Sequence, residues 1–241
     1  MYYLQLINMD FLINKEKFAD IWSDDLTIAI PAMDMVIFTI YKWELCIVLW
    51  YDRERFPNKY ALPGWIIAKW YSLENNFDTI LERETGIKQW VYKEQLYTFG
   101  SPDRDDRWHV ISISYFSLVR AQSFLTDIDF SKIDLVKYKD LDKIETLYDH
   151  KTIIEYAKQR LRWKLEYTNM AKDMLWESFR IAQLQEVYEI VLWKKIDKRN
   201  FQKKIFKLKM IEETGALDKT TNRPAKLYRF VDTELKVYEV I

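Results

Sequence analysis

The stretch from Asp197 to Lys209 carries the side chains in this chain that are best suited to binding a polyanion. Asp197 is placed to cap a helix in which Phe201, Ile205 and Leu208 form an apolar face. The other face and the approach to the helix carry Lys195, Lys198, Arg199, Asn200, Gln202, Lys203 and Lys204. Arginine, asparagine and glutamine make bidentate hydrogen bonds to base edges, and lysine neutralises phosphates. This pattern predicts a helix that enters a groove of duplex DNA.

Two neighbouring segments would position that helix. Residues 183–192 place apolar side chains at helical spacing, and residues 210–230 predict a strand, a polar tip and a second strand. The hairpin would bring Lys219, Arg223 and Lys226 to the DNA backbone or minor groove. A helix, a short turn, a basic helix and a hairpin together predict a winged helix-turn-helix. A solvated basic helix beside a surface hairpin is the simpler alternative.

The charge of the chain is zero overall but is unevenly distributed. Residues 151–241 contain 20 Lys+Arg and 13 Asp+Glu, and residues 1–150 contain 17 and 24. This asymmetry predicts two domains, residues 1–150 and residues 151–241, of which the second would face a polyanion such as DNA. Chance distribution of surface charge is the alternative. Helical spacing over residues 152–174 predicts a helix at the start of the second domain, which could link the domains and help two copies dimerise.

The first domain has the pattern of an α/β fold. Apolar, β-branched runs predict strands over residues 27–40, 44–51, 91–99 and 109–119, with a hairpin turn from Tyr41 to Trp43. Ser72 and Gly86 are typical of the start and stop of a helix over residues 72–85.

Residues 61–87, ALPGWIIAKWYSLENNFDTILERETGI, resemble the Nudix box G-x5-E-x7-R-E-U-x-E-E-x-G-U, where U is a bulky aliphatic residue. The closing Gly86 and Ile87 set the register, and Leu81 fits the aliphatic position. Most polar positions of the box differ, because they hold Trp65, Tyr71, Thr79, Ile80 and Arg83. Glu84 alone remains of the expected acids. Mg²⁺ needs several oxygen ligands, so we expect no metal site, no cofactor and no catalytic residue.

The resemblance extends beyond the box. Four further segments, residues 94–119, 161–171, 184–205 and 222–230, are similar to Nudix-related transcriptional regulators of the NrtR type and to their sugar-responsive relatives. It implies an α/β Nudix-like sandwich with a mixed sheet, followed by a winged helix-turn-helix. It also implies a homodimeric repressor that binds a double-stranded operator and senses ADP-ribose, a related nucleotide or a pentose.

By this resemblance, the effector cleft lies between the box and the loop that follows it. The candidate partners for phosphate or hydroxyl groups are Arg53, Arg55, Glu84, Asp103, Arg104 and Arg107, with Asp105 as a further acceptor. Trp50 or Tyr51 could stack on a base. His109 and His150 are too few and too far apart for a metal site or a catalytic triad, and we expect them to be structural.

Other classes of protein are less consistent with the pattern. A Nudix-type hydrolase with an atypical metal site is the enzyme alternative, and an RNA- or protein-binding adaptor is a third possibility. The N-terminal segment lacks the basic start of a signal peptide and no apolar run reaches membrane-spanning length, so no membrane partner is expected. The single cysteine, Cys46, fits a reducing, cytoplasmic environment.

The chain has 4 glycines and 10 tryptophans. Several tryptophans occupy positions where a turn, a helix end or the box pattern favours glycine: Trp43, Trp65, Trp70, Trp108 and Trp193. One hypothesis is that the source gene uses UGA for glycine and that translation with UGA as tryptophan gave this sequence. Ordinary aromatic drift is the alternative.

Overall fold

The computed structural model describes residues 29–88, 91–120, 125, 128–220 and 224–240. Its larger sheet has the order β5-β6-β1-β2-β3-β8, with β4 paired to β1 and β7 paired to β2. The bounds are β1 Ile30–Tyr41, β2 Glu44–Tyr51, β3 Lys59–Ala61, β4 Gly64–Ile66, β5 Tyr92–Phe99, β6 Val110–Leu118, β7 Ile133–Lys137 and β8 Glu145–Thr146. β1 runs parallel to β6 and antiparallel to β2 and β4, so the predicted mixed sheet is confirmed.

The long central strand β1 divides the sheet. Its first half pairs with β4 from Ala32 to Asp34, and its second half pairs with β2 from Ile37 to Tyr41. Because β2 and β4 share one edge of β1, they separate where the pairing changes. This fork opens the sheet near Asp34.

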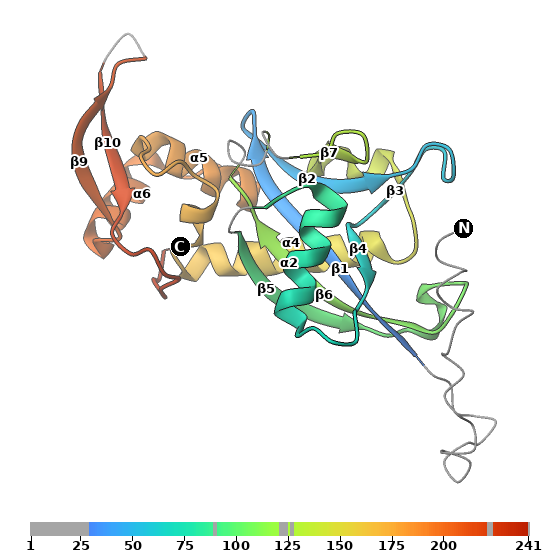
Figure 1. Cartoon of the computed structure of the whole chain (residues 1–241). Coiled ribbons are helices and arrows are strands. Elements are labelled where there is room, and N and C mark those ends of the chain that lie inside the picture. Colours follow the sequence, from blue (N-terminus) through green and yellow to red (C-terminus); the bar gives the residue numbers. More distant parts are fainter. Residues whose placement is uncertain (1–28, 89–90, 121–124, 126–127, 221–223, 241) are drawn as a thin grey trace.

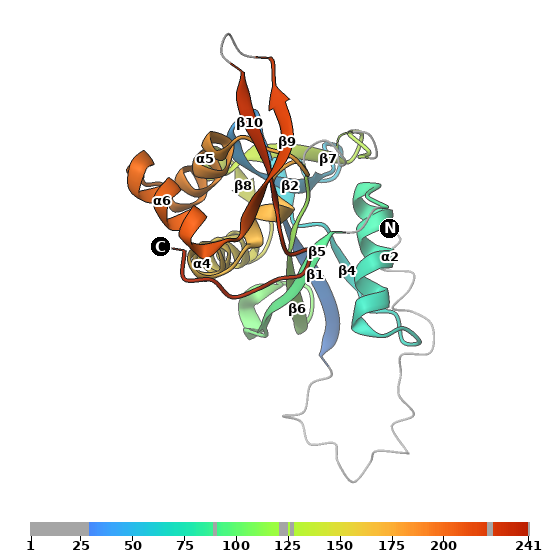
Figure 2. The same ribbon diagram turned by 90° about the vertical axis from the view of Figure 1, so that its left-hand side faces the viewer.

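β1 is buried on both faces because each face packs on a different helix. Met33, Met35 and Ile37 pack in one core with α2 (Leu73–Thr85), whereas Val36 and Phe38 belong to the core that contains α4 (His150–Tyr167). The alternation follows from the two-residue period of a strand. Figure 2 shows α2 and α4 on opposite sides of the sheet. The Ser72 hydroxyl caps α2, and Gly86, at φ 82°, ends it, as predicted.

The predicted helix over residues 152–174 is wrong in its length. α4 ends at Tyr167 because Thr168 is extended and its hydroxyl hydrogen-bonds back to the Lys164 carbonyl. A short 3-10 turn, η4 (Met170–Asp173), follows. Two further 3-10 segments, η2 (Pro102–Arg104) and η3 (Tyr138–Lys143), lie earlier in the chain.

The C-terminal part has α5 (Ile181–Leu192), α6 (Lys198–Leu208) and an antiparallel hairpin of β9 (Ile211–Asp218) and β10 (Ala225–Phe230). Figure 1 shows the hairpin projecting away from the larger sheet. One continuous hydrophobic core includes one sheet face, α4, α5, α6 and β10. No helix in the described ranges is both long and apolar enough to cross a bilayer.

Candidate functional site

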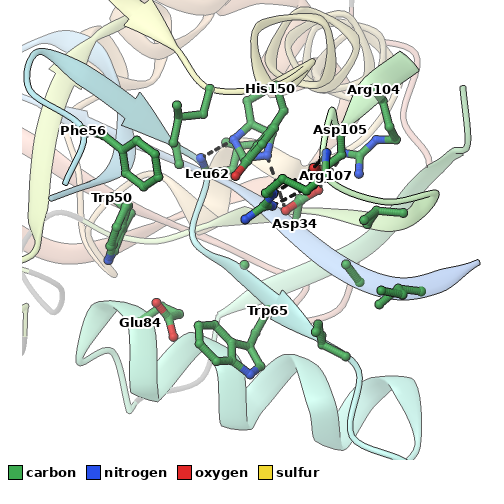
Figure 3. A pocket seen from close by; sticks show the side chains of 18 of the residues that line it. Asp34, Trp50, Phe56, Leu62, Trp65, Glu84, Arg104, Asp105, Arg107 and His150 are labelled. Atoms are coloured by element: carbon green, nitrogen blue, oxygen red, sulfur yellow. Dashed lines mark hydrogen bonds and ion pairs between the residues drawn. The ribbon is translucent and has the colours of Figure 1, made fainter. Parts of the chain in front are cut away.

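The fork between β2 and β4 opens into a cleft of about 200 Å³. Figure 3 shows Trp50 and Phe56 at one end, Trp65 and Glu84 beside α2, and a cluster of charged side chains at the other end. Trp50, at the end of β2, and Trp65, on β4, supply aromatic surface. The cleft therefore combines flat apolar walls with a charged end, as in sites that bind a ring joined to polar groups.

The structure brings four of the six predicted effector residues to this cleft: Arg55, Glu84, Arg104 and Arg107. Arg53 and Asp103 are not among its lining residues. The Arg53 guanidinium lies over the Tyr51 ring instead, 4.9 Å from its centre, and Asp103 is exposed in η2. Of the two aromatic candidates, Trp50 lines the cleft, and the Tyr51 hydroxyl donates to the Phe130 carbonyl.

Arg104 is buried between two carboxylates, and its side chain is only 3% exposed. Nη2 donates to Asp34 Oδ2 at 3.1 Å, while Nε and Nη2 donate to the two carboxylate oxygens of Asp149 at 3.1 and 2.8 Å. Burial would lower the pKa of Arg104, but the two carboxylates outweigh burial and raise it. Arg104 thus joins Asp34 and Asp149 through charged hydrogen bonds, and it also lines the cleft.

His150 lines the cleft and joins the same network. Its Nδ1 accepts a hydrogen bond from the Leu62 backbone N–H at 2.8 Å, and its Nε2 lies 3.6 Å from Asp34 Oδ1. Burial lowers the pKa of His150, which favours a neutral ring with its proton on Nε2. His150 therefore has the structural role expected from the sequence, in a position that faces the cleft.

Arg107 forms the exposed rim of the charged end. It donates to both carboxylate oxygens of Asp105, at 2.9 and 2.7 Å, and lies over the Tyr148 ring, 4.6 Å from its centre. Burial alone would raise the pKa of Asp105, but the hydrogen bonds from Arg107 hold it below its usual value. Asp105 therefore stays ionised and keeps part of the arginine charge neutralised.

The residues of the box do not fit a magnesium ion. Glu84 is paired with Arg83 at 2.7 Å, and the Arg83 guanidinium lies 4.1 Å from the centre of the Trp65 ring. No group of three or more His, Cys, Asp or Glu side chains in the described residues could hold a metal. A guanidinium thus stands beside the one remaining box acid, where a metal would need further oxygen ligands.

Sequence reasoning missed Asp34, Asp149 and Tyr148 as parts of this site. Asp34 had a visible signal, because it is the single charged residue in the apolar run that forms β1. Asp149 and Tyr148 had none, since their partners Arg104 and Arg107 are distant in sequence.

The second candidate site is the helix-turn-helix. α5 begins at Ile181, two residues before the prediction, and α6 begins at Lys198, where the Asp197 carboxylate accepts the Asn200 N–H at 2.8 Å. Phe201 and Ile205 are buried against the core. The polar side chains of α6 are all at least partly accessible: Lys198, Arg199, Asn200 and Lys203 are exposed, and Gln202 and Lys204 are half-buried.

The hairpin after α6 supplies the remaining predicted residues. Lys219 is exposed at its tip, and Lys226 pairs with Glu213 across the two strands at 2.7 Å. Arg223 lies outside the described residues. Lys195, in the turn before α6, pairs with Glu189, which raises the pKa of the lysine and offsets its charge locally but leaves the side chain 93% exposed.

Five tryptophans were expected at glycine-like positions, and the backbone separates them into two groups. Trp43, in the β1–β2 hairpin, has φ 59°, and Trp193, after α5, has φ 54° and caps the helix. Both are in the left-handed region that favours glycine. Trp65, Trp70 and Trp108 have no positive φ, and Trp65 is extended within β4. The expectation that Trp65 occupies a position where the backbone favours glycine was therefore wrong.

The larger sheet has this fork, and α2, the helix of the box, packs on one of its faces. Together with the C-terminal winged helix, these features define a Nudix-like domain joined to a DNA-binding module. Residues 171–230 match the family described as NrtR DNA-binding winged helix domain. The chain therefore has an NrtR-type winged helix domain after its Nudix-like domain, and it is similar to the NrtR-type transcriptional regulators.

Individual relatives agree with this family. The chain is 28% identical to the ADPR responsive transcriptional repressor NtrR of Acinetobacter baylyi, over 93% of this chain and 91% of that one. It resembles the structure of Shewanella oneidensis NrtR complexed with a 27mer DNA, with a TM-score of 0.74, 28% identity and coverage of 83% and 92%. It is also 32% identical to an ADP-ribose pyrophosphatase of Methanocaldococcus jannaschii, over 48% of this chain and 67% of that one.

Proposed function

We propose that this chain is a repressor that binds operator DNA through α6 and the β9–β10 hairpin, and that releases it when ADP-ribose or a related nucleotide fills the cleft. The observation that carries the proposal is the accessible polar face of α6, set on a helix-turn-helix whose core is continuous with the cleft-bearing sheet. The repressor and the pyrophosphatase among its relatives are both named for ADP-ribose. A pentose is the alternative effector.

The effector site we propose contains Arg55, Glu84, Arg104 and Arg107, with Trp50 for ring stacking. Arg55 is the best candidate for a phosphate partner, because it lines the cleft and its guanidinium forms no ion pair within the described residues. The guanidinium lies over the Phe56 ring, 5.1 Å from its centre. Arg53 and Asp103 stay predictions of lower rank, since they are not on the cleft wall.

The DNA site we propose contains Lys195, Lys198, Arg199, Asn200, Gln202, Lys203, Lys204, Arg223 and Lys226. Arg199, Asn200 and Gln202 would contact base edges, and the lysines would contact phosphates. A boundary near residue 150 between an effector domain and a DNA-binding domain is part of the same proposal. Two copies would bind a two-fold symmetric operator, which a measured solution mass of twice one chain would support.

The proposal includes binding of the effector without its hydrolysis. One carboxylate paired with Arg83 supplies too few oxygen ligands to polarise a diphosphate through Mg²⁺. The experiment combines two measurements: thermal shift with ADP-ribose and with pentoses, and release of AMP in the presence of Mg²⁺. A raised melting temperature with no AMP supports a sensor. Metal-dependent AMP release that Glu84→Gln abolishes would support the hydrolase alternative.

A further inference from the structure

We propose that the Arg104–Asp149 ion pair transmits occupancy of the cleft to the winged helix. The inference rests on the proposed function of the cleft and adds the route by which the effector acts. Arg104 lines the cleft, and Asp149 is the residue immediately before α4. One bidentate contact therefore joins the binding surface to the start of the helix that leads to the DNA-binding module.

The carboxylate of Asp149 accepts hydrogen bonds from Arg104 and does not cap α4. It occupies the N-cap position of α4, where an aspartate usually accepts a backbone N–H, but it makes no such cap hydrogen bond. Both of its oxygens accept from the Arg104 guanidinium. Loosening this ion pair would free the carboxylate to cap α4, so the helix start has two alternative sets of hydrogen bonds.

The Arg104 guanidinium has a donor available to a ligand. Nε and Nη2 are bonded to Asp34 and Asp149, whereas Nη1 has no hydrogen-bond partner within the described ranges. A ligand oxygen that binds Nη1 would compete with Asp149 for the orientation of the planar group. A guanidinium holds its five donors in one plane, so a rotation that favours one acceptor weakens the others.

The backbone next to Asp149 is already strained. Tyr148 has φ 54°, which is unfavourable for a side chain of this size, and its ring contacts the Arg107 guanidinium and the His150 ring. Strained backbone at a ligand site persists because surrounding contacts hold it, and it relaxes when those contacts change. An effector that binds Arg104 and Arg107 would change the contacts of the Tyr148 ring, through Arg107, and those of the next residue, Asp149, through Arg104.

α4 can carry such a change to the DNA-binding module. Its buried residues Ile153, Ala157, Leu161 and Leu165 are in the same core as Leu184 and Val187 of α5. Closely packed helices move as units, because their interface does not deform continuously. A displacement of the first turn of α4 would therefore alter the placement of α5 and, through it, α6.

The experiment compares the parent chain with Asp149→Asn, which keeps the size of the side chain and removes one charge-assisted acceptor. The DNA probe is a duplex selected in vitro with the parent chain, and the ligand is ADP-ribose. We expect Asp149→Asn to remain folded and to bind both ADP-ribose and DNA, and each affinity is measured on its own because Asp149 contacts Arg104 at the cleft. We expect the ratio of DNA affinities without and with ADP-ribose to fall at least about fivefold, because coupling of this kind is typically about 5- to 150-fold.

Asp142→Asn is the matched control, because Asp142 pairs with Lys151 in the same first turn of α4 but outside the cleft. An unchanged ratio in Asp149→Asn, or an equal loss in Asp142→Asn, would overturn the proposal. Failure of the parent itself to respond on DNA would count against the proposed function. In that case, hydrogen exchange of the backbone amides of residues 150–157 tests the ion pair without DNA. Equal protection by ADP-ribose in the parent and in Asp149→Asn would overturn the proposed role of the Arg104–Asp149 ion pair.

Discussion

The guanidinium of Arg83 lies 4.1 Å from the centre of the Trp65 ring and is bonded to Glu84. Arg83 occupies a position where the Nudix box has an acid, and Trp65 occupies a position where the box has a glycine. A fixed cation and an indole therefore fill space beside the one retained acid, and the site recognises its ligand without a metal in our account.

ADP-ribose binding should be independent of Mg²⁺. We expect titration calorimetry to give the same dissociation constant in Mg²⁺ and in EDTA, and we expect Glu84→Gln to change it by less than about tenfold, the effect of one hydrogen bond of about 1 kcal/mol. An affinity that requires Mg²⁺ would mean that oxygen ligands assemble at the box after all.

Replacing Arg55 should weaken effector binding. Loss of a hydrogen bond to a charged phosphate costs about 1.5–3 kcal/mol, so Arg55→Ala should raise the dissociation constant for ADP-ribose by about 10- to 100-fold. Arg53→Ala is the control, because Arg53 is close in sequence but is not on the cleft wall. Equal losses in the two variants would indicate a general charge effect.

Two substitutions in α6 should separate base contacts from phosphate contacts. Arg199→Ala should cost about 1–3 kcal/mol on selected DNA and relax its sequence preference, whereas Lys203→Ala should weaken binding to all sequences and reduce the salt dependence by about one ion. Fluorescence anisotropy at several salt concentrations measures both effects. Lys143→Ala, a distant exposed lysine paired with Asp140, should leave binding unchanged.

Glycine should stabilise the protein at the two tryptophans whose backbone is in the left-handed region. Trp193→Gly and Trp43→Gly each relieve backbone strain of about 1 kcal/mol, which corresponds to a rise in melting temperature of about 2–4 °C. Trp65→Gly should lower it, because Trp65 is extended and packs under Arg83. A change in melting temperature of the same sign for Trp65→Gly and Trp193→Gly would contradict this explanation.

Stability should depend on pH through His150. Burial lowers its pKa in the folded protein, while the unfolded chain takes up a proton near the ordinary value of 6.5. The unfolded state therefore binds more protons as the pH falls below 6.5, and the folded state loses stability. His150→Asn should remove this loss, which urea unfolding at about pH 7.5 and about pH 5.5 would detect as a difference of about 1 kcal/mol. Equal pH dependence in both proteins would show that His150 is already protonated when folded.

Local patterns predicted α6 and its cap at Asp197 almost to the residue, because a cap and an apolar face are both encoded within a few positions. Arg104 shows the limit of such patterns. It was predicted as a partner for phosphate or hydroxyl groups and it lines the cleft, but its burial between Asp34 and Asp149, which lie 70 and 45 residues away, was not predicted. Ion pairs between such distant residues depend on tertiary packing, and no local spacing encodes them.

The length of α4 illustrates the same limit at a helix end. Apolar spacing continues to Met170, but the backbone leaves the helix at Thr168, where the side-chain hydroxyl bonds to the Lys164 carbonyl. Periodicity indicates which face is buried and does not fix where the chain turns.

One titration distinguishes a repressor that ADP-ribose releases from DNA from an enzyme that hydrolyses ADP-ribose. ADP-ribose is added, with Mg²⁺ present, to the chain bound to its selected DNA, while fluorescence anisotropy follows the complex and chromatography follows the nucleotide. We expect the DNA to dissociate and the ADP-ribose to remain intact. Accumulation of AMP with no change in the amount of bound DNA would contradict it.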